Sequence, residues 1–247
     1  MLSFAGRLQL IKAVLFGVLN FWCRQVILPK AVIKKVNQLC ARFFWKDKDI
    51  PATGARVSWK SICSPKAEGG LGVKNLCSWN HACIIHLVKS LLANESSLWA
   101  AWVKVYIFKG VDFWHIDNKP HFSWCIRKLL KLRGVAQPLF ADGSNGALLK
   151  VKDIWDSIRE RQAKVIWHRL IWYSLHVPRH SIILWMTLLD RLPTKDRLLR
   201  MGIVVEETCL NCGVMHETRD HLFFFSVAFL KASGNLSCTF VQLPGIV

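Results

Sequence analysis

The sequence predicts a mainly α-helical fold: a helical N-terminal region joined to a small helical domain that ends in a degenerate Cys/His knuckle. Apolar residues recur every three or four positions along most of the chain, and the alternation typical of strands is scarce. Near the C-terminal end, Cys209 and Cys212 form a Cys-x2-Cys pair, and His221 follows nine positions later. Two thiolates so close in a turn can bind one metal ion, and a later imidazole can join them, as in structural zinc sites.

Two amphipathic helices are expected at the N-terminal end. The first begins near Ser3 and ends before Pro29, because proline restricts the residue that precedes it. Its apolar face comprises Leu8, Ile11, Leu15, Val18, Leu19 and Trp22. The second helix is expected to turn Val32, Val36, Leu39 and Phe43 inward and Lys34, Lys35, Gln38 and Arg42 outward. Further helices are predicted at about 80–92, capped by Ser78 or Asn80, and at 99–108, 126–133, 154–161, 182–189 and 195–200.

The composition indicates a folded protein with a polyanionic partner. Of the 247 residues, 52% are hydrophobic and 12 are Trp, so the chain can build a core. The net charge of +18 favours nucleic acid, RNA or DNA, over an anionic membrane, although a basic surface without a specific partner gives the same total. Six residues on two amphipathic helices are candidates for binding phosphates: Lys34, Lys35, Arg42, Arg127, Lys128 and Lys131.

No membrane partner is expected from the sequence. The longest apolar run, Ala13 to Phe21, is shorter than the roughly 20 residues that a bilayer requires. Most of the nine cysteines stand singly within helical patterns, which indicates free thiols rather than a disulfide framework. We therefore expect a reduced, intracellular protein, with the nucleus as one candidate location.

The glycines of Glu68-Gly69-Gly70-Leu71-Gly72 do not form a phosphate-binding loop. The Gly-Lys-Ser/Thr ending and a preceding strand are both missing. The glycines are expected to allow positive φ angles at a turn.

Several motifs together resemble the zinc-binding domain at the end of reverse transcriptases of plant LINE-type (non-LTR) retrotransposons. In the C-terminal part they are Pro178-Arg179-His180, Trp185, Arg191 to Leu198, Cys209-x2-Cys212, Glu217-Thr218 and Asp220 to Phe224. Two N-terminal segments, Leu2 to Lys12 and Ile27 to Lys30, resemble the region just after the polymerase palm in the same family. The pattern Pro-Lys-x-x-Gly-Gly-Leu-Gly, which starts at Pro65, also matches it.

This resemblance implies three parts and a zinc site with one ligand missing. Residues 1–146 are the post-palm connection, residues 147–230 the zinc-binding domain and residues 231–247 a divergent tail. The family has a cysteine five positions after the histidine, where this chain has Ser226. A neutral hydroxyl is a poor zinc ligand, so His216, Cys238 or water remain alternatives for the fourth position.

The sequence predicts that the chain is not an enzyme by itself. Two-metal phosphoryl transfer needs converging carboxylates. Phe140-Ala141-Asp142-Gly143 offers a single aspartate, and no two aspartates are adjacent in the chain. The expected function is thus a non-catalytic C-terminal part of a retrotransposon reverse transcriptase that binds nucleic acid and zinc. The alternatives are a decayed copy without selected function and a fragment that supports reverse transcription only when a palm domain is supplied in trans.

Overall fold

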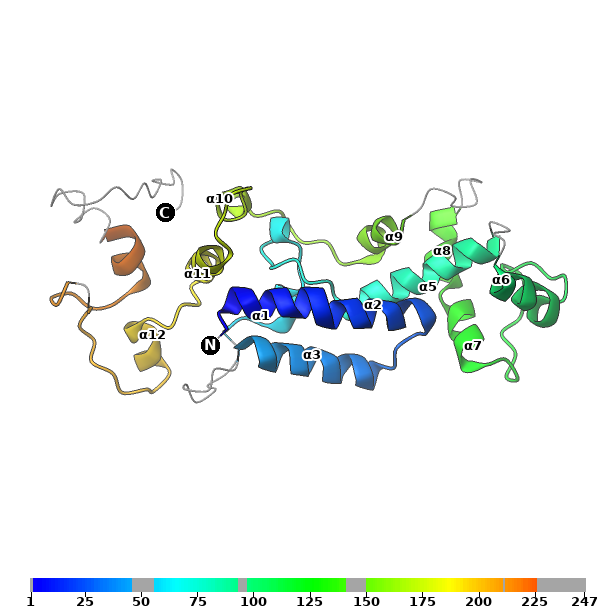
Figure 1. Cartoon of the computed structure of the whole chain (residues 1–247), viewed down its shortest axis with the longest axis horizontal. Helices are drawn as coiled ribbons and strands as arrows, with labels where there is room; N and C mark the ends of the chain where they lie inside the picture. Colours follow the sequence, from blue (N-terminus) through cyan, green and yellow to red (C-terminus); the bar gives the residue numbers. More distant parts are fainter. Residues whose placement is uncertain (1, 46–55, 93–96, 141–149, 211, 226–247) are drawn as a thin grey trace. The chain divides into compact units, whose positions relative to one another are not determined.

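A computed structural model describes residues 2–45, 56–92, 97–140, 150–210 and 212–225 of the chain (Figure 1). The predicted mainly helical fold is confirmed: helices account for the regular structure in these ranges, and the β-pairing found there is one antiparallel bridge between Thr208 and His216. The boundary that the sequence predicted after residue 146 falls within 141–149, outside the described residues.

The chain divides into two compact units, Met1–Tyr173 and Ser174–Val247. This division does not coincide with the sequence-based boundary after residue 146. The reason is helix α9 (Val151–Ile158), which packs against α5 (Leu76–Leu92) of the first unit. Each unit is described by itself below.

The first unit consists of helices and connecting turns. Its α-helices are α1 (Phe4–Leu10), α2 (Phe16–Gln25), α3 (Lys30–Trp45), α4 (Trp59–Ile62), α5 (Leu76–Leu92), α6 (Leu98–Trp102), α7 (Trp124–Lys131), α8 (Arg133–Phe140), α9 (Val151–Ile158) and α10 (His168–Ile171). Two π-helical segments, η1 (Ile11–Leu15) and η3 (Val103–Phe108), and one 3₁₀ turn, η2 (Lys66–Glu68), complete it. The N-terminal helix runs beside α3 in Figure 1, where α1 and α3 are in contact.

The π-helical segment η1 shifts the buried face of the first helix by one residue. The amide of Phe16 donates to the carbonyl of Ile11, five residues earlier, so this turn holds one residue more than an α-turn. Beyond Ile11 the sequence-based prediction is correct for Leu19, which is partly buried, and wrong for three inward positions, which are exposed: Leu15, Val18 and Trp22. The residues that follow each of them are partly or fully buried instead: Phe16, Leu19 and Cys23.

The predicted inward face of the second helix, α3, also needs correction. Leu39 is 52% exposed, and Val32 and Phe43 are exposed as well. The buried positions are Cys40 and Phe44, which follow Leu39 and Phe43 directly. Helical periodicity alone allowed either of these neighbouring stripes, because apolar residues occupy both. The basic residues Lys34, Lys35 and Arg42 are exposed, as expected.

Helix α5 organises the core of the first unit because it is buried on two sides. One side joins residues from α6, η3 and α7, with Ile84, Val88, Leu91, Val103, Phe108, Ile126 and Leu129 among them. The other side joins residues from α2, α8 and α9, with Cys23, Leu76, Trp79, Cys83, Ile85, Ala136, Ile154 and Trp155 among them. The helix begins earlier than predicted, because the Asn75 side chain accepts hydrogen bonds from the amides of Cys77 and Ser78.

A buried asparagine on α5 fixes the end of α2. The Asn80 side chain is 1% exposed, and its Oδ1 atom accepts a hydrogen bond of 2.8 Å from the Leu28 amide. Its Nδ2 atom donates to the carbonyls of Cys23 at 3.0 Å and Val26 at 2.8 Å. Asn80 therefore serves backbone groups that the end of the helix leaves without a helical partner.

The glycine-rich turn after η2 confirms the prediction of positive φ angles. Gly69 has φ +85° and Gly72 has φ +70°. Gly70 serves a different purpose, since a Cβ atom there would lie 2.0 Å from the Ser64 carbonyl oxygen. The turn places Glu68 on the side of the first unit that receives α9.

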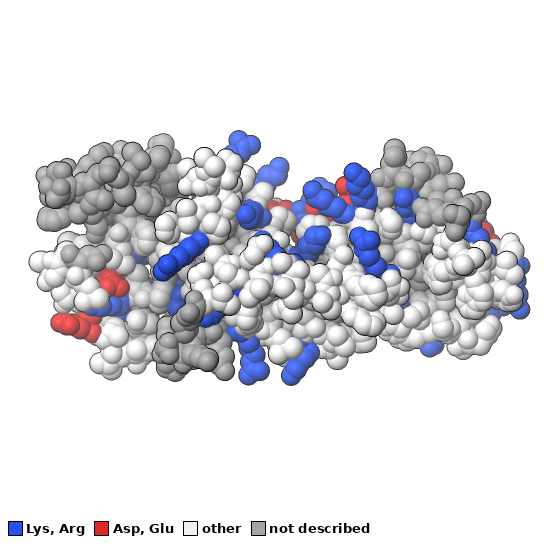
Figure 2. Space-filling view, in the orientation of Figure 1, with Lys and Arg blue, Asp and Glu red and all other residues white. Residues whose placement is uncertain are grey.

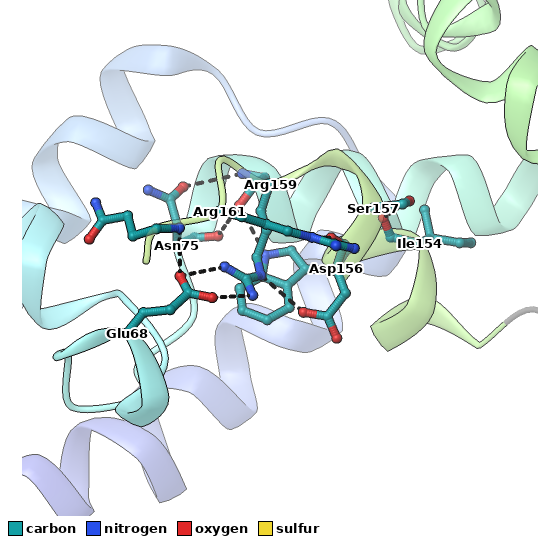
Figure 3. A network of polar contacts seen from close by, with 10 residues as sticks. Glu68, Asn75, Ile154, Asp156, Ser157, Arg159 and Arg161 are labelled. Atoms are coloured by element: carbon teal, nitrogen blue, oxygen red, sulfur yellow. Dashed lines mark hydrogen bonds and ion pairs between the residues drawn. The ribbon is translucent and has the colours of Figure 1, made fainter. Parts of the chain in front are cut away.

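A partly buried ion pair connects the segment after α9 to η2, directly before this turn (Figure 3). The Arg159 guanidinium donates to both carboxylate oxygens of Glu68, at 2.7 and 2.8 Å, and its Nε donates to Asp156 at 2.9 Å. The amide of Gln162 adds a hydrogen bond of 3.1 Å to Glu68. The Arg159 hydrogen bonds are the main reason why the pKa of Glu68 lies below its ordinary value. Sequence positions about ninety residues apart are thereby held together.

The second unit contains α11 (Pro178–Leu188), α12 (Lys195–Arg200) and the π-helical turn η4 (His221–Phe225). Proline occupies the first turn of α11, where its missing N–H costs no helical hydrogen bond. The buried side chains of α11 include Ile182, Trp185 and Met186. Asp190 follows this helix with φ +53° and starts the turn toward α12.

The N-terminal helix is long and apolar enough to be compared with a membrane-spanning helix. The continuous helix Phe4–Gln25 has 22 residues and a mean hydropathy of 1.3, so its length and composition are sufficient to cross a bilayer. Of its most apolar stretch, 17% is buried within the protein. Core helices of folded proteins and N-terminal signal sequences share these properties. The expectation that the chain has no membrane partner therefore stays a prediction.

Candidate metal centre

Three side chains that can bind a metal ion converge in the second unit. One ligand atom each of Cys209, Cys212 and His221 lie within 4.8 Å of one another. The Nε2 atom of His221 is 3.2 Å from the Sγ atom of Cys212. Cys209 and His221 are buried, whereas Cys212 is partly exposed. The structure thus brings together the three ligands that the sequence predicted, and we call them the Cys/His cluster.

The dimensions of the Cys/His cluster suit zinc. Tetrahedral zinc, with Zn–S bonds of about 2.3 Å and Zn–N bonds of about 2.0 Å, separates its ligand atoms by roughly 3.5–3.8 Å. The Cys212 to His221 distance of 3.2 Å is slightly shorter than this range, and the remaining separations do not exceed 4.8 Å, so the three side chains are close enough to share one ion. Two thiolates and one imidazole are also a donor set that zinc prefers over Mg²⁺ or Ca²⁺.

The backbone around the cysteine pair forms a tight turn that favours thiolate. The amide of Cys209 donates to the Met215 carbonyl and the amide of Gly213 to the Cys209 carbonyl, both at 2.8 Å. Gly213 has φ +68°, a left-handed conformation that costs glycine little. The amide of Met215 points at Cys212 Sγ from 3.4 Å. Hydrogen bonds from Met215 and Val214 are the main causes that lower the pKa of Cys212 to about 7.

Motif residues of the second unit position this turn. The Lys195 ammonium donates to the Thr208 carbonyl at 2.6 Å, directly before Cys209. The Lys195 amide donates to the Glu217 carboxylate at 3.3 Å. Thr218 Oγ1 accepts a hydrogen bond of 3.1 Å from the amide of His221, at the start of η4. Lys195, Glu217 and Thr218 of these motifs therefore hold the segments that carry the candidate metal ligands.

The fourth position of the Cys/His cluster is not filled by His216 in this structure. His216 Nδ1 lies 2.8 Å from Glu207 Oε2, and its side chain is 74% exposed. His216 also does not belong to the group of converging ligands found among the described residues. Ser226 and Cys238, the other protein candidates, lie outside those residues, and water stays an alternative.

The residues predicted to bind nucleic acid lie on two separate helices of the first unit. Lys34, Lys35 and Arg42 are on α3. Arg127, Lys128 and Lys131 are on α7, where they line a hollow of about 250 Å³ together with Trp124. Their role stays a prediction. Sequence reasoning missed a larger basic cleft in the same unit, because its residues come from distant parts of the chain.

Comparisons with known proteins bear on the C-terminal part. Residues 149–231 match the family described as zinc-binding in reverse transcriptase. Over 98 residues, or 40% of its length, the chain is 40% identical to the "Putative ribonuclease H protein" of Arabidopsis thaliana, and this match spans 16% of that protein. No solved structure is similar to the chain.

The coarser part of the predicted resemblance, to the zinc-binding part of reverse transcriptases, is confirmed by the family match. The matching segment contains the whole Cys/His cluster. It also begins before α9, so it extends over both units of the structure.

Proposed function

We propose that the chain is a non-catalytic segment of a plant LINE-type reverse transcriptase that holds zinc and binds RNA or DNA. The observation that carries the proposal is the convergence of Cys209, Cys212 and His221 within a segment similar to the zinc-binding part of reverse transcriptases. Metal binding to a site that the unfolded chain lacks contributes directly to folding. The zinc ion would therefore act structurally and order the turn around the cysteine pair.

The distribution of charge supports nucleic-acid binding by the first unit. Residues 1–173 carry 27 Lys and Arg against 10 Asp and Glu, a surplus of 17. Residues 174–247 carry 7 against 6, a surplus of 1. Because phosphates are bound chiefly through positive charge, the first unit supplies the affinity, and the Cys/His cluster contributes structure.

The non-catalytic character rests on the sequence, which has no adjacent aspartate pair to hold two metal ions. Catalysis would have to come from a palm domain elsewhere in the same reverse transcriptase. Such a protein works where RNA is copied into DNA, which agrees with an intracellular, nuclear location.

Zinc affinity of the full chain, measured by competition with a coloured chelator, tests the metal site. We expect uptake of one ion and a loss of affinity of at least tenfold in Cys212→Ser and in His221→Ala. Cys125→Ser is the matched control, because Cys125 is an exposed thiol outside the Cys/His cluster. Equal affinity in all four proteins would refute the assignment of the ligands.

The missing fourth ligand is tested by Ser226→Cys. If three ligands leave one position open, the new thiolate should raise zinc affinity and protect the segment from Cys209 onward against proteolysis. An unchanged affinity would mean that another group already completes the site.

Nucleic-acid binding is tested by fluorescence anisotropy with single-stranded RNA and DNA of mixed sequence. Affinity should fall steeply as salt rises and should differ little between sequences, because counterions are released from phosphates. No binding at low salt would refute this part of the proposal.

A further inference from the structure

A cleft among the described residues of the first unit is lined by positive charge. It has a volume of about 890 Å³, within the range of ordinary ligand pockets. Six cationic side chains line it: Lys12, Arg24, Lys74, Lys89, Lys150 and Lys152. Within the part of the chain that the structure describes, no carboxylate lines it. We call this feature the basic cleft.

The basic cleft is assembled from distant segments. Lys12 lies on η1 and Arg24 on α2, Lys74 precedes α5 and Lys89 lies on it. Lys150 caps the N-terminal end of α9, and Lys152 lies in its first turn. Figure 2 shows Lys and Arg side chains gathered over the part of the first unit that contains α2, α5 and α9 in Figure 1. The packing of α9 on α5 thus completes the basic cleft.

Two lysines are held in place within the basic cleft. Lys12 Nζ donates to the Leu71 carbonyl at 2.6 Å. Lys74 Nζ lies 3.2 Å from the centre of the Trp79 ring, and the Trp79 indole donates to Asn20 at 2.9 Å. Cations fixed in this way lose little side-chain entropy when an anion binds.

Two lysines of the basic cleft, Lys12 and Lys74, have pKa values below the ordinary value of lysine. Burial, and then the charge of Lys66, lower the pKa of Lys12 to about 8. Burial is also the main reason why the pKa of Lys74 is lowered. Asp156 is the acidic group that acts on Lys74, but its carboxylate accepts a hydrogen bond from Arg159 Nε. A bound anion would relieve the mutual repulsion of these cations.

The shape of the basic cleft favours a nucleic-acid strand over a membrane surface. A lipid surface is flat and meets exposed cations, whereas Lys12 and Lys74 are only partly exposed and lie within a depression. A strand can enter a depression and place successive phosphates near several cations. The Trp79 ring is buried beneath Lys74 and offers no free face for a base, so phosphates rather than bases are the recognised groups.

We propose that the basic cleft binds the sugar-phosphate backbone of a single nucleic-acid strand without reading its bases. The inference rests on the proposed nucleic-acid function and assigns that function to a defined site. It also makes strand binding independent of the Cys/His cluster, which lies in the nearly neutral second unit.

Two triple variants with the same change in net charge test the assignment. The cleft variant combines Arg24→Gln, Lys150→Gln and Lys152→Gln, and all three side chains are exposed, so the fold should tolerate it. The matched control combines the exposed α3 residues as Lys34→Gln, Lys35→Gln and Arg42→Gln. Affinity for single-stranded RNA and DNA is measured by anisotropy over a range of salt, and circular dichroism verifies the helix content.

The cleft variant should lose at least tenfold in affinity at constant salt, and the control less than threefold. Each lost phosphate contact should reduce the slope of log K against log salt by about 0.7, so three contacts reduce it by about 2. Both effects should be the same for strands of different sequence, and both should persist when zinc is removed with a chelator.

Equal losses in the two variants would overturn the cleft assignment and leave the proposed nucleic-acid function intact. No binding by the unmodified chain would refute the proposed function itself. Vesicles of phosphatidylserine and phosphatidylcholine provide the membrane comparison. If the cleft variant loses vesicle binding but keeps strand binding, the basic cleft recognises lipid headgroups, and the inference is wrong.

Discussion

The ion pair between Arg159 and Glu68 should contribute far more to stability than a second ion pair that joins nearly the same parts of the chain. Lys60 and Glu160 are 3.1 Å apart, and their side chains are 73% and 83% exposed. The Arg159 and Glu68 side chains are only 13% and 8% exposed and share two parallel hydrogen bonds. The two pairs thus compare a partly buried with an exposed link between the chain from α4 to η2 and the end of α9.

The expected energies follow from burial and hydrogen bonding. Removal of one member of a fully buried pair costs about 3–5 kcal/mol. The Arg159–Glu68 pair is only partly buried, so its removal should cost less than that. Arg159→Ala also removes the hydrogen bond to Asp156 and the contact with Trp155, so the stability lost in this single variant is larger than the contribution of the Arg159–Glu68 pair alone. A double-mutant cycle with Glu68→Ala isolates the coupling, which we expect at about 2–3 kcal/mol. The same cycle on Lys60 and Glu160 should give below about 0.5 kcal/mol.

Hydrogen exchange of the α9 amides, followed by mass spectrometry of the intact protein, measures these energies locally. This readout suits a chain with two units, for which a single global unfolding free energy is not well defined. A coupling of 2–3 kcal/mol corresponds to a change in protection of roughly 30- to 150-fold, since about 1.4 kcal/mol is a factor of ten. If the coupling energy of Arg159 and Glu68 were no larger than that of Lys60 and Glu160, the view that the Arg159–Glu68 pair holds α9 in place would be refuted.

Three further predictions concern groups of the first unit. The pKa of Glu68 in the folded protein lies below its ordinary value of 4.5, so the α9 amides should be fully protected against hydrogen exchange above pH 4.5 and lose protection as the pH falls below it. If a Glu68→Gln variant lost protection just as strongly at low pH, the Glu68 carboxylate would not be its cause. Asn80→Asp replaces a donor to two carbonyls with an acceptor and should lower the local stability of α5, measured by hydrogen exchange of its amides, by about 2–4 kcal/mol. The exposed control Asn118→Asp should change it by less than about 0.5 kcal/mol, and similar costs would argue against the role of Asn80. Burial raises the pKa of Cys63 to about 12, so at pH 8 a thiol reagent should modify exposed Cys77 quickly and Cys63 only after unfolding; equal rates would show that Cys63 is accessible.

The sequence by itself determined the features that depend on short stretches of chain. Helical periodicity is a local property, so the helical class and the approximate positions of most helices could be predicted. The spacing of Cys209, Cys212 and His221 is likewise local, because two cysteines in one turn and a histidine shortly after it can meet without long-range folding. The positive φ angles at Gly69 and Gly72 also follow from residue type at a turn.

Tertiary structure decided which face of each helix is buried and where the charges gather. The π-helical turn at Ile11 adds one residue, which moves the buried stripe of the first helix by one position. In α3 the sequence offers two neighbouring apolar stripes, and tertiary packing buries the one that contains Cys40 and Phe44. Helix α9 joins the first unit through its packing on α5 and the Arg159–Glu68 pair, contacts that connect positions far apart in sequence. The basic cleft could not be predicted from the sequence for the same reason, because its lysines and arginine become neighbours only when η1, α2, α5 and α9 pack together.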